Sequence, residues 1–287
     1  EREKLTINQA TTMKQWSLRE AVEGYAARDI RGISVWRDKL AECGVEVAAE
    51  LLRDNGMTVT GLCRGGMFPA NDDAGRQAAH DDNRRAVDEA AAIGAQCLVM
   101  VCGGLPDGSK DMIDARIQVA DGLERMLHYA REAGVPVAIE PLHPMTAADR
   151  ACVNTLEHAL DLCDALGEGI GVAVDVYHVW WDPKLEDQIA RAADRILGFH
   201  VCDWLVPTVD LVWDRGMMGD GVIDIPRIRG WVEAAGYRGF NEIEIFSERN
   251  WWQRDPEEVV ETCVDGEVCQ DGECQCVSAG EMARDGQ

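Results

Sequence analysis

Four residues that can bind a metal or move a proton stand at the ends of short apolar runs: Glu140, Asp175, His200 and Glu244. Such runs are typical of buried strands in a parallel sheet, where a charged residue is unusual. Carboxylates that converge in a cavity of low dielectric constant repel one another by roughly several kcal/mol, and a divalent cation offsets that repulsion. Three carboxylates and one imidazole therefore predict a site for one divalent metal.

The predicted donor atoms are hard oxygens and one imidazole nitrogen, which disfavours a metal that prefers thiolates. We predict Mn²⁺ ahead of Mg²⁺, Co²⁺ and Zn²⁺. Glu242 is a rival ligand because it lies two residues before Glu244 and so faces the same side of a strand. We favour Glu244, which is nearer to the C-terminal end of that strand. Separate structural ion pairs remain the alternative interpretation of these four residues.

The elements that would position these residues alternate along the chain. Short apolar runs predict strands at 5–9, 32–36, 58–62, 96–101, 135–140, 171–176, 196–201 and 241–246. Spacing of three and four residues between apolar positions predicts helices at 17–27, 44–55, 84–93, 115–133, 155–166, 183–192 and 225–235. Eight successive βα units predict a closed (β/α)₈ TIM barrel, whose active site lies at the C-terminal ends of the strands. An open doubly wound sheet is the alternative, but no G-x-G-x-x-G follows the first strand.

Composition and net charge argue against several classes of protein. The 287 residues are 46% hydrophobic and 28% charged, with a net charge of −24. That charge argues against binding to nucleic acid or to an anionic membrane. No apolar run approaches the ~20 residues that span a bilayer. The sequence begins without a basic segment followed by an apolar one, so we expect a cytoplasmic location.

The 11 cysteines fall into two groups. Seven are scattered singly among apolar residues, as is typical of small buried side chains in a reducing compartment. The other four, Cys263, Cys269, Cys274 and Cys276, lie in an acidic segment without hydrophobic periodicity, and their spacing lacks the C-x₂-C pairs of structural zinc sites. We predict a TIM-barrel catalytic domain over residues 1–261 and a flexible acidic tail over 262–287 that contributes neither core nor catalysis.

The predicted strand ends also carry a family resemblance. The segments I-E-P-L-H at 139–143, V-D-V-Y-H at 174–178, G-F-H-V at 198–201 and E-I-E-I-F at 242–246 resemble the metal-binding strand ends of the xylose isomerase-like TIM barrels, the sugar phosphate isomerase/epimerase family. The resemblance covers residues 5 to about 260. It implies that Glu140, Asp175, His200 and Glu244 bind one metal, and that Glu140 and Glu244 act as an acid and base pair.

The same resemblance implies that His178 and Arg215 contact the substrate. One position departs from the pattern: ketose epimerases usually have Asn where this chain has His143. The form E-P-L-H-P is similar to the catalytic subunit of bacterial C-glycoside deglycosidases, in which His143 would be the base; a hydrogen-bonding role for His143 is the other interpretation. Trp181 and Trp204 follow strand ends on the predicted active face, where tryptophans stack on sugar rings or anchor subunit interfaces.

These features predict a metal-dependent enzyme that removes a proton next to the carbonyl of a sugar or keto-sugar and stabilises the resulting enediolate. Isomerisation or epimerisation is our first hypothesis. Elimination from a 3-keto C-glycoside by a C-deglycosidase-type lyase is the second, and a metal-dependent endonuclease or a noncatalytic sugar sensor has less support. We expect a small sugar or glycoside as substrate and no nucleic-acid or membrane partner. We also expect an oligomer, to which the deglycosidase alternative would add a small second subunit.

Overall fold

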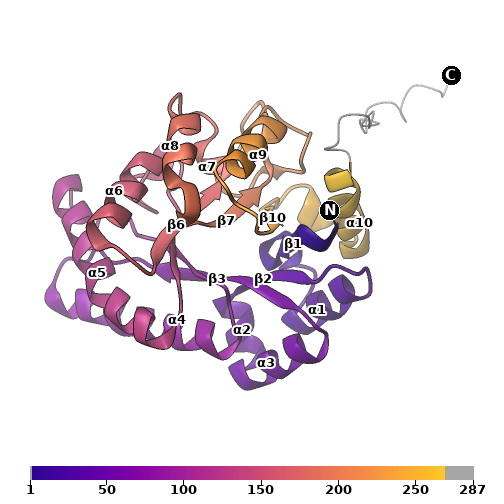
Figure 1. Ribbon diagram of the computed structural model, residues 1–287, viewed down its shortest axis with the longest axis horizontal. Coiled ribbons are helices and arrows are strands. Elements are labelled where there is room, and N and C mark those ends of the chain that lie inside the picture. The colour runs from indigo at the N-terminus through magenta and orange to yellow at the C-terminus, as the bar shows by residue number, and fades with distance from the viewer. Residues whose placement is uncertain (1, 269–287) are drawn as a thin grey trace.

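Eight parallel strands close into a barrel in the computed structural model, which describes residues 2–268 (Figure 1). The strands are β1 (Leu5–Asn8), β2 (Gly32–Trp36), β3 (Thr58–Gly66), β4 (Leu98–Val101), β5 (Val137–Ile139), β6 (Ile170–Asp175), β7 (Ile196–Val201) and β10 (Asn241–Ile243). The barrel closes where β1 pairs with β10, with Ile7 opposite Ile243. The predicted (β/α)₈ barrel is confirmed, and each predicted strand overlaps an observed one.

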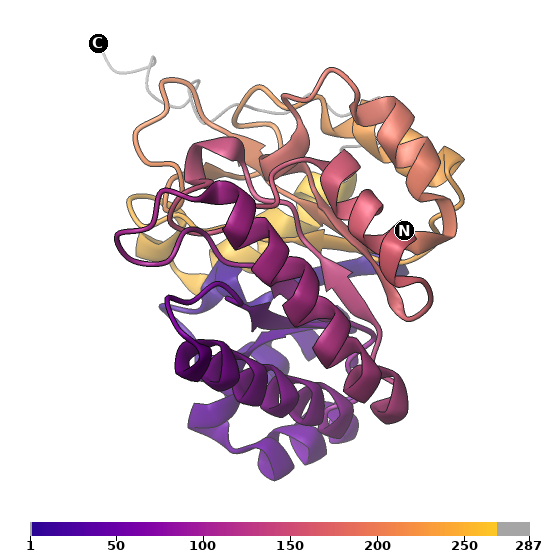
Figure 2. The same cartoon turned by 90° about the vertical axis from the view of Figure 1, so that its left-hand side faces the viewer.

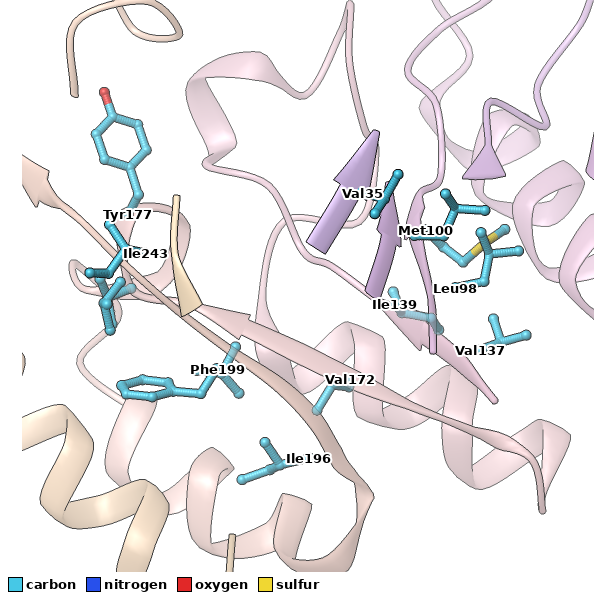
Figure 3. Packing of buried hydrophobic residues seen from close by; sticks show 14 of the residues in the cluster. Val35, Leu98, Met100, Val137, Ile139, Val172, Tyr177, Ile196, Phe199 and Ile243 are labelled. Carbon is cyan, nitrogen blue, oxygen red and sulfur yellow. The ribbon is translucent and has the colours of Figure 1, made fainter. Parts of the chain in front are cut away.

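The strands form because their residues are apolar, often β-branched, and buried on both faces. Every residue of β4 and of β6 is buried. Figure 3 shows Leu98 and Met100 of β4 beside Val137 and Ile139 of β5, which pair in register. This packing fixes the strand ends and therefore the residues that follow them.

Helices surround the strands (Figure 1). They are α1 (Leu18–Ala26), α2 (Arg37–Cys43), α3 (Val45–Asp54), α4 (Asp73–Ala92), α5 (Met112–Ala133), α6 (Leu156–Leu166), α7 (Val176–Val179), α8 (Leu185–Ala192), α9 (Ile225–Ala234) and α10 (Pro256–Val268). The two long helices α4 and α5 lie side by side on the face turned to the viewer in Figure 2. A small antiparallel ribbon of β8 (Asp203–Trp204) and β9 (Arg215–Gly216) stands apart from the barrel.

Local signals explain several helix ends. Ser17 and Glu20 form a reciprocal capping box at the start of α1. Gly134 ends α5 in the left-handed conformation, with φ of 69°. Helix α4 starts at Asp73, well before the predicted residue 84, because Asp72 caps it by accepting a hydrogen bond from the Gly75 backbone N–H at 2.8 Å. Its first turns are polar and so lack the apolar spacing on which the prediction depended. Helices α2 and α7 are short and were not predicted.

The C-terminal part of the described chain corrects the predicted domain boundary. Helix α10 runs to Val268, past residue 261, and Cys263 is fully buried with its Sγ 3.9 Å from the Sδ of Met217. The expectation that the segment from residue 262 contributes no core is therefore wrong for Cys263 and Val264, which both pack in the main hydrophobic cluster. The other three cysteines of that segment lie outside the described residues. Between residues 2 and 268, no helix is both long and apolar enough to cross a bilayer.

Candidate metal centre

The four predicted metal ligands lie together at the C-terminal end of the barrel. Glu140 directly follows β5, Asp175 ends β6, His200 lies in β7 and Glu244 directly follows β10. All four side chains are buried, and one donor atom from each lies within 4.8 Å of the others. The reason is the order of the strands: β5, β6, β7 and β10 are consecutive neighbours in the barrel, and Asp175 pairs directly with His200.

The charges within this group are only partly balanced by the protein. His200 Nδ1 lies 2.9 Å from Glu140 Oε1, and Arg215 Nη1 donates to Asp175 Oδ2 at 3.1 Å and to Glu244 Oε2 at 3.0 Å. Burial raises the pKa of Glu244 to about 8, against the opposing effect of Arg215. Burial disfavours charged His200, but the neighbouring carboxylates outweigh it and raise the pKa of His200 well above its usual value. A divalent cation suits this concentration of buried carboxylates, and the donor atoms are of the type that such an ion prefers.

Glu242, the rival ligand, belongs to a second layer below this group. Its Oε1 accepts a hydrogen bond from Asn8 Nδ2 at 2.7 Å, and its Oε2 accepts one from Thr60 Oγ1 at 2.9 Å. The same Oε1 lies 3.6 Å from His200 Nε2, the ring nitrogen that faces away from Glu140. Glu242 therefore orients His200, whose Nδ1 lies beside Glu140.

Asn8 connects the two layers, and the sequence analysis missed it. Its Nδ2 donates to both Glu242 and Glu244, and its Oδ1 accepts from Trp36 Nε1 at 2.7 Å. Asn8 ends β1, so a polar residue at a strand end was the available signal. A neutral residue at a strand end is a weak sign of a functional site, and the pairing of Asn8 with Glu242 depends on strand register.

His178 and Arg215 also reach the group. His178 lies in α7, one turn after Asp175, and its Nε2 is 3.5 Å from Asp175 Oδ2. Burial lowers the pKa of His178 to about 3, so its ring is neutral. Its Nδ1 accepts a hydrogen bond from the backbone N–H of His143 at 3.1 Å, which places the ring proton on Nε2. The Arg215 guanidinium lies between the rings of Tyr177 and Phe246, with its Cζ 4.4 and 4.8 Å from their centroids.

His178, Arg215 and Phe246 line one cavity together with Glu140 and Glu244. Its polar lining includes Glu140, Glu244, His178 and Arg215, and its apolar lining includes Trp36, Val99, Val101, Leu142, Leu211, Val212 and Phe246. Two carboxylates, a neutral imidazole that donates from Nε2 and a fixed guanidinium can bind a polyhydroxylated molecule and move a proton on it.

The sequence pattern of the xylose isomerase-like TIM barrel family matches residues 20–263. The chain belongs to that family. A search of curated proteins found no match. Among solved structures, this xylose isomerase-like barrel is 57% identical to protein SMc04130 from Sinorhizobium meliloti 1021, with a TM-score of 0.93 over 94% of this chain and 98% of that one.

Two more distant structures share the fold. The IOLI protein, whose structure holds a zinc atom, is 20% identical with a TM-score of 0.81, over 93% of this chain and 97% of that one. D-allulose 3-epimerase from Methylomonas sp. is 19% identical with a TM-score of 0.75, over 93% and 97%. At these identities the likeness establishes the barrel of the xylose isomerase-like family and not the reaction.

Three predicted site residues lie apart from the cavity of this xylose isomerase-like barrel. His143, Trp181 and Trp204 pack on one another, with the His143 ring centroid 4.8 Å from that of Trp204 and 5.9 Å from that of Trp181. His143 Nδ1 accepts a hydrogen bond from the Met145 backbone N–H at 3.2 Å, and Trp181 Nε1 donates to the His178 carbonyl at 2.8 Å. None of the three is among the described residues that line the cavity, so the structure does not bring them to Glu140 and Glu244.

Proposed function

We propose that this protein is a divalent-metal-dependent enzyme of the sugar isomerase/epimerase type, which removes a proton from the carbon next to the carbonyl of a sugar or keto-sugar and returns it. One observation carries the proposal: Glu140 and Glu244 line the same cavity and lie within 4.8 Å of Asp175 and His200. Epimerisation removes a proton from one face of a carbon and returns a proton to the other face, so it needs two groups that exchange the roles of acid and base, and two carboxylates in one cavity supply them. The sugar epimerases that share the fold support this class of reaction.

Glu140, Asp175, His200 and Glu244 would hold the ion, and we propose Mn²⁺ ahead of Mg²⁺, Co²⁺ and Zn²⁺. Such an ion supplies Lewis-acid polarisation of the substrate carbonyl and stabilises the negative charge that develops when a proton leaves the adjacent carbon.

The side chains around the two glutamates fix their positions. Glu140 is held by His200, and Glu244 is held on one oxygen by Asn8 and on the other by Arg215. His178, protonated on Nε2, can donate a hydrogen bond to a substrate oxygen, and the Arg215 guanidinium lies 3.3 Å from that nitrogen. When one glutamate takes a proton from carbon, the N–H donors of His178 and Arg215 therefore lie nearby and stabilise the negative charge left on oxygen.

The elimination alternative places the base on His143. The His143 ring packs against Trp204 with its Nδ1 engaged by a backbone N–H, and burial lowers the pKa of His143. These contacts give His143 a role in holding the loop after β5 and favour the two glutamates for proton transfer.

Deuterium exchange tests the proposal. The protein loaded with Mn²⁺ is incubated with D-allulose, D-fructose and related ketoses in D₂O, and NMR follows deuterium at the carbon next to the carbonyl and any new epimer. We expect exchange that disappears on chelation and in Glu244→Gln, while Glu248→Gln, an exposed carboxylate on the same segment, retains it. A protein that binds the metal but exchanges no proton on any ketose, and instead cleaves a 3-keto glycoside, would refute the proposal.

A further inference from the structure

Two arginines that the proton transfer does not use line the same cavity. Arg64 lies in β3, and Arg150 lies in the loop between β5 and α6. Both side chains are half-buried. Within residues 2–268, neither guanidinium forms a hydrogen bond or an ion pair, whereas Arg37 contacts two carboxylates and Arg215 contacts two more. Neither guanidinium has its charge offset by an acidic partner in the described chain, so both are available to an anionic ligand in the cavity.

The backbone directs both arginines into the cavity. The register between β3 and β4 shifts between Cys63 and Gly65, which makes Arg64 the additional residue of a bulge. Bulges turn a side chain away from the direction that regular strand alternation would give it. Arg150 is fixed by its backbone N–H, which donates to the Thr146 carbonyl at 3.0 Å, and its guanidinium lies 6.0 Å from the centroid of the Trp213 ring.

The two positive charges act on each other. Burial, followed by the charge of Arg150, lowers the pKa of Arg64, and Glu140 opposes this only partly. Arginine nevertheless stays protonated in proteins, so the pair is a fixed concentration of positive charge. It stands out in a chain with a net charge of −24. An oxyanion bound between the two guanidinium groups would remove their repulsion.

We propose that Arg64 and Arg150 bind an acidic group of the substrate, a phosphate or a carboxylate, while the metal centre holds the carbonyl end of the same molecule. The substrate is then an acidic keto-sugar, either a sugar phosphate or a sugar acid. This inference rests on the proposed function, because it assigns a substrate class to the same cavity. Guanidinium groups suit both kinds of oxyanion, since their paired N–H donors match two oxygens at once.

Three ligands with one carbon skeleton test the inference: D-fructose, D-fructose 6-phosphate and D-fructuronate. C6 carries a hydroxyl in the first and a phosphate in the second, and it is the carboxylate carbon in the third. Calorimetry measures their dissociation constants with the Mn²⁺-loaded full chain. We expect at least one acidic ligand to bind at least ~10-fold more tightly than D-fructose, as charge-assisted hydrogen bonds allow. The acidic ligand that binds more tightly identifies the group as phosphate or carboxylate.

The double variant R64Q/R150Q should lose this preference and bind the three ligands with similar dissociation constants. R64K/R150K should retain part of it, and R19Q, which removes an exposed charge outside the cavity, should retain all of it. Thermal unfolding and metal content show that each variant is folded and loaded, and the single variants R64Q and R150Q replace the double one if it does not fold. Equal binding of the three ligands, or a preference that survives in R64Q/R150Q, would overturn the inference.

The same samples separate this inference from the proposed function. Deuterium exchange on D-fructose without any preference for the acidic ligands would overturn the anion site and leave the proton transfer standing. A preference that depends on Arg64 and Arg150, without exchange on any ligand, would support the anion site and count against the proton transfer.

Discussion

The two halves of the barrel contribute differently to the cavity. Strands β5, β6, β7 and β10 position all four residues of the candidate metal centre. Strands β1 to β4 end in neutral or apolar residues such as Asn8, Trp36 and Val101, which support the ligands or line the cavity. The exception is Arg64, which a bulge turns into the cavity. The four proposed ligands therefore all come from the second half of the barrel, whereas the residues that support them come from both halves, Asn8 from the first and Glu242 from the second, so mutation can change the support while the four residues stay in place.

Matched truncations at the ends of adjacent strands give the largest expected contrast. Glu140→Ala removes a metal ligand and one of the two acid–base groups, so turnover should fall by at least ~10²–10⁴-fold with loss of the metal. Val101→Ala, at the end of the neighbouring strand β4, removes only apolar lining and should leave turnover within ~10-fold, at a cost of about 1–3 kcal/mol in the free energy of unfolding. Metal analysis and a kinetic assay measure both. Full metal occupancy in Glu140→Ala and in Asp175→Ala would disprove the assigned centre.

Removal of one charge from the layer below the ligands should have a smaller effect. Glu242→Gln keeps the shape of the side chain but weakens its hold on His200, so affinity for Mn²⁺ should fall by ~10–100-fold, the usual result of changing a residue that orients a metal-bound histidine. Titration of the metal-free protein with Mn²⁺ measures this, with Glu248→Gln as the control. If Glu242→Gln abolished metal binding to the same extent as Glu140→Ala, Glu242 would itself be a ligand.

Asn8→Ala tests whether the first half of the barrel supports the second. The variant leaves Trp36 Nε1 without its acceptor and frees Glu242 and Glu244 from their shared donor. An unpaired buried polar group costs about 1–3 kcal/mol, so thermal unfolding should occur at a lower temperature and turnover should fall by ~3–10-fold. Unchanged stability and turnover would show that the two halves act independently.

The smallest effect is expected at His143. His143→Asn leaves all four ligands in place and changes a ring that packs on Trp204 outside the cavity lining, so turnover should stay within ~3-fold and metal content should not change. Kinetics and deuterium exchange on the same substrate check this. A loss of ~10²-fold with the metal retained would make His143 a base and would favour the elimination reaction.

The sequence predicted the barrel and the four residues that meet at its C-terminal end because both depend on local signals. A short apolar run followed by a charged residue is visible without any knowledge of pairing, and the predicted strand 171–176 differs from β6 (Ile170–Asp175) by one residue at each end. The layer that contains Asn8, Thr60 and Glu242 depends on which strands face each other across the barrel. The identity of neutral polar residues in separate strands does not indicate which of them lie opposite one another.

Helix α10 shows a different kind of failure. Its buried residues Val259, Val260, Cys263 and Val264 follow the spacing of one helix face, so the signal was present in the sequence. The acidic composition after residue 261 and the cluster of cysteines instead favoured a flexible tail. No helix is therefore predicted over 256–268, although Cys263 counted with the apolar residues completes the spacing of one.

The ribbon β8–β9 brings Arg215 into the cavity from a segment outside the barrel wall. Asp203 connects the two ends of the segment 203–224, since its carboxylate accepts hydrogen bonds from the backbone N–H groups of Gly219 and Ile223, both at 3.0 Å. A segment whose ends are already joined can be exchanged with little disturbance of its surroundings. Residues 203–224 are therefore a natural cassette for grafting between related barrels, a route to new substrate preferences provided that the grafted segment keeps an arginine at position 215 to contact Asp175 and Glu244.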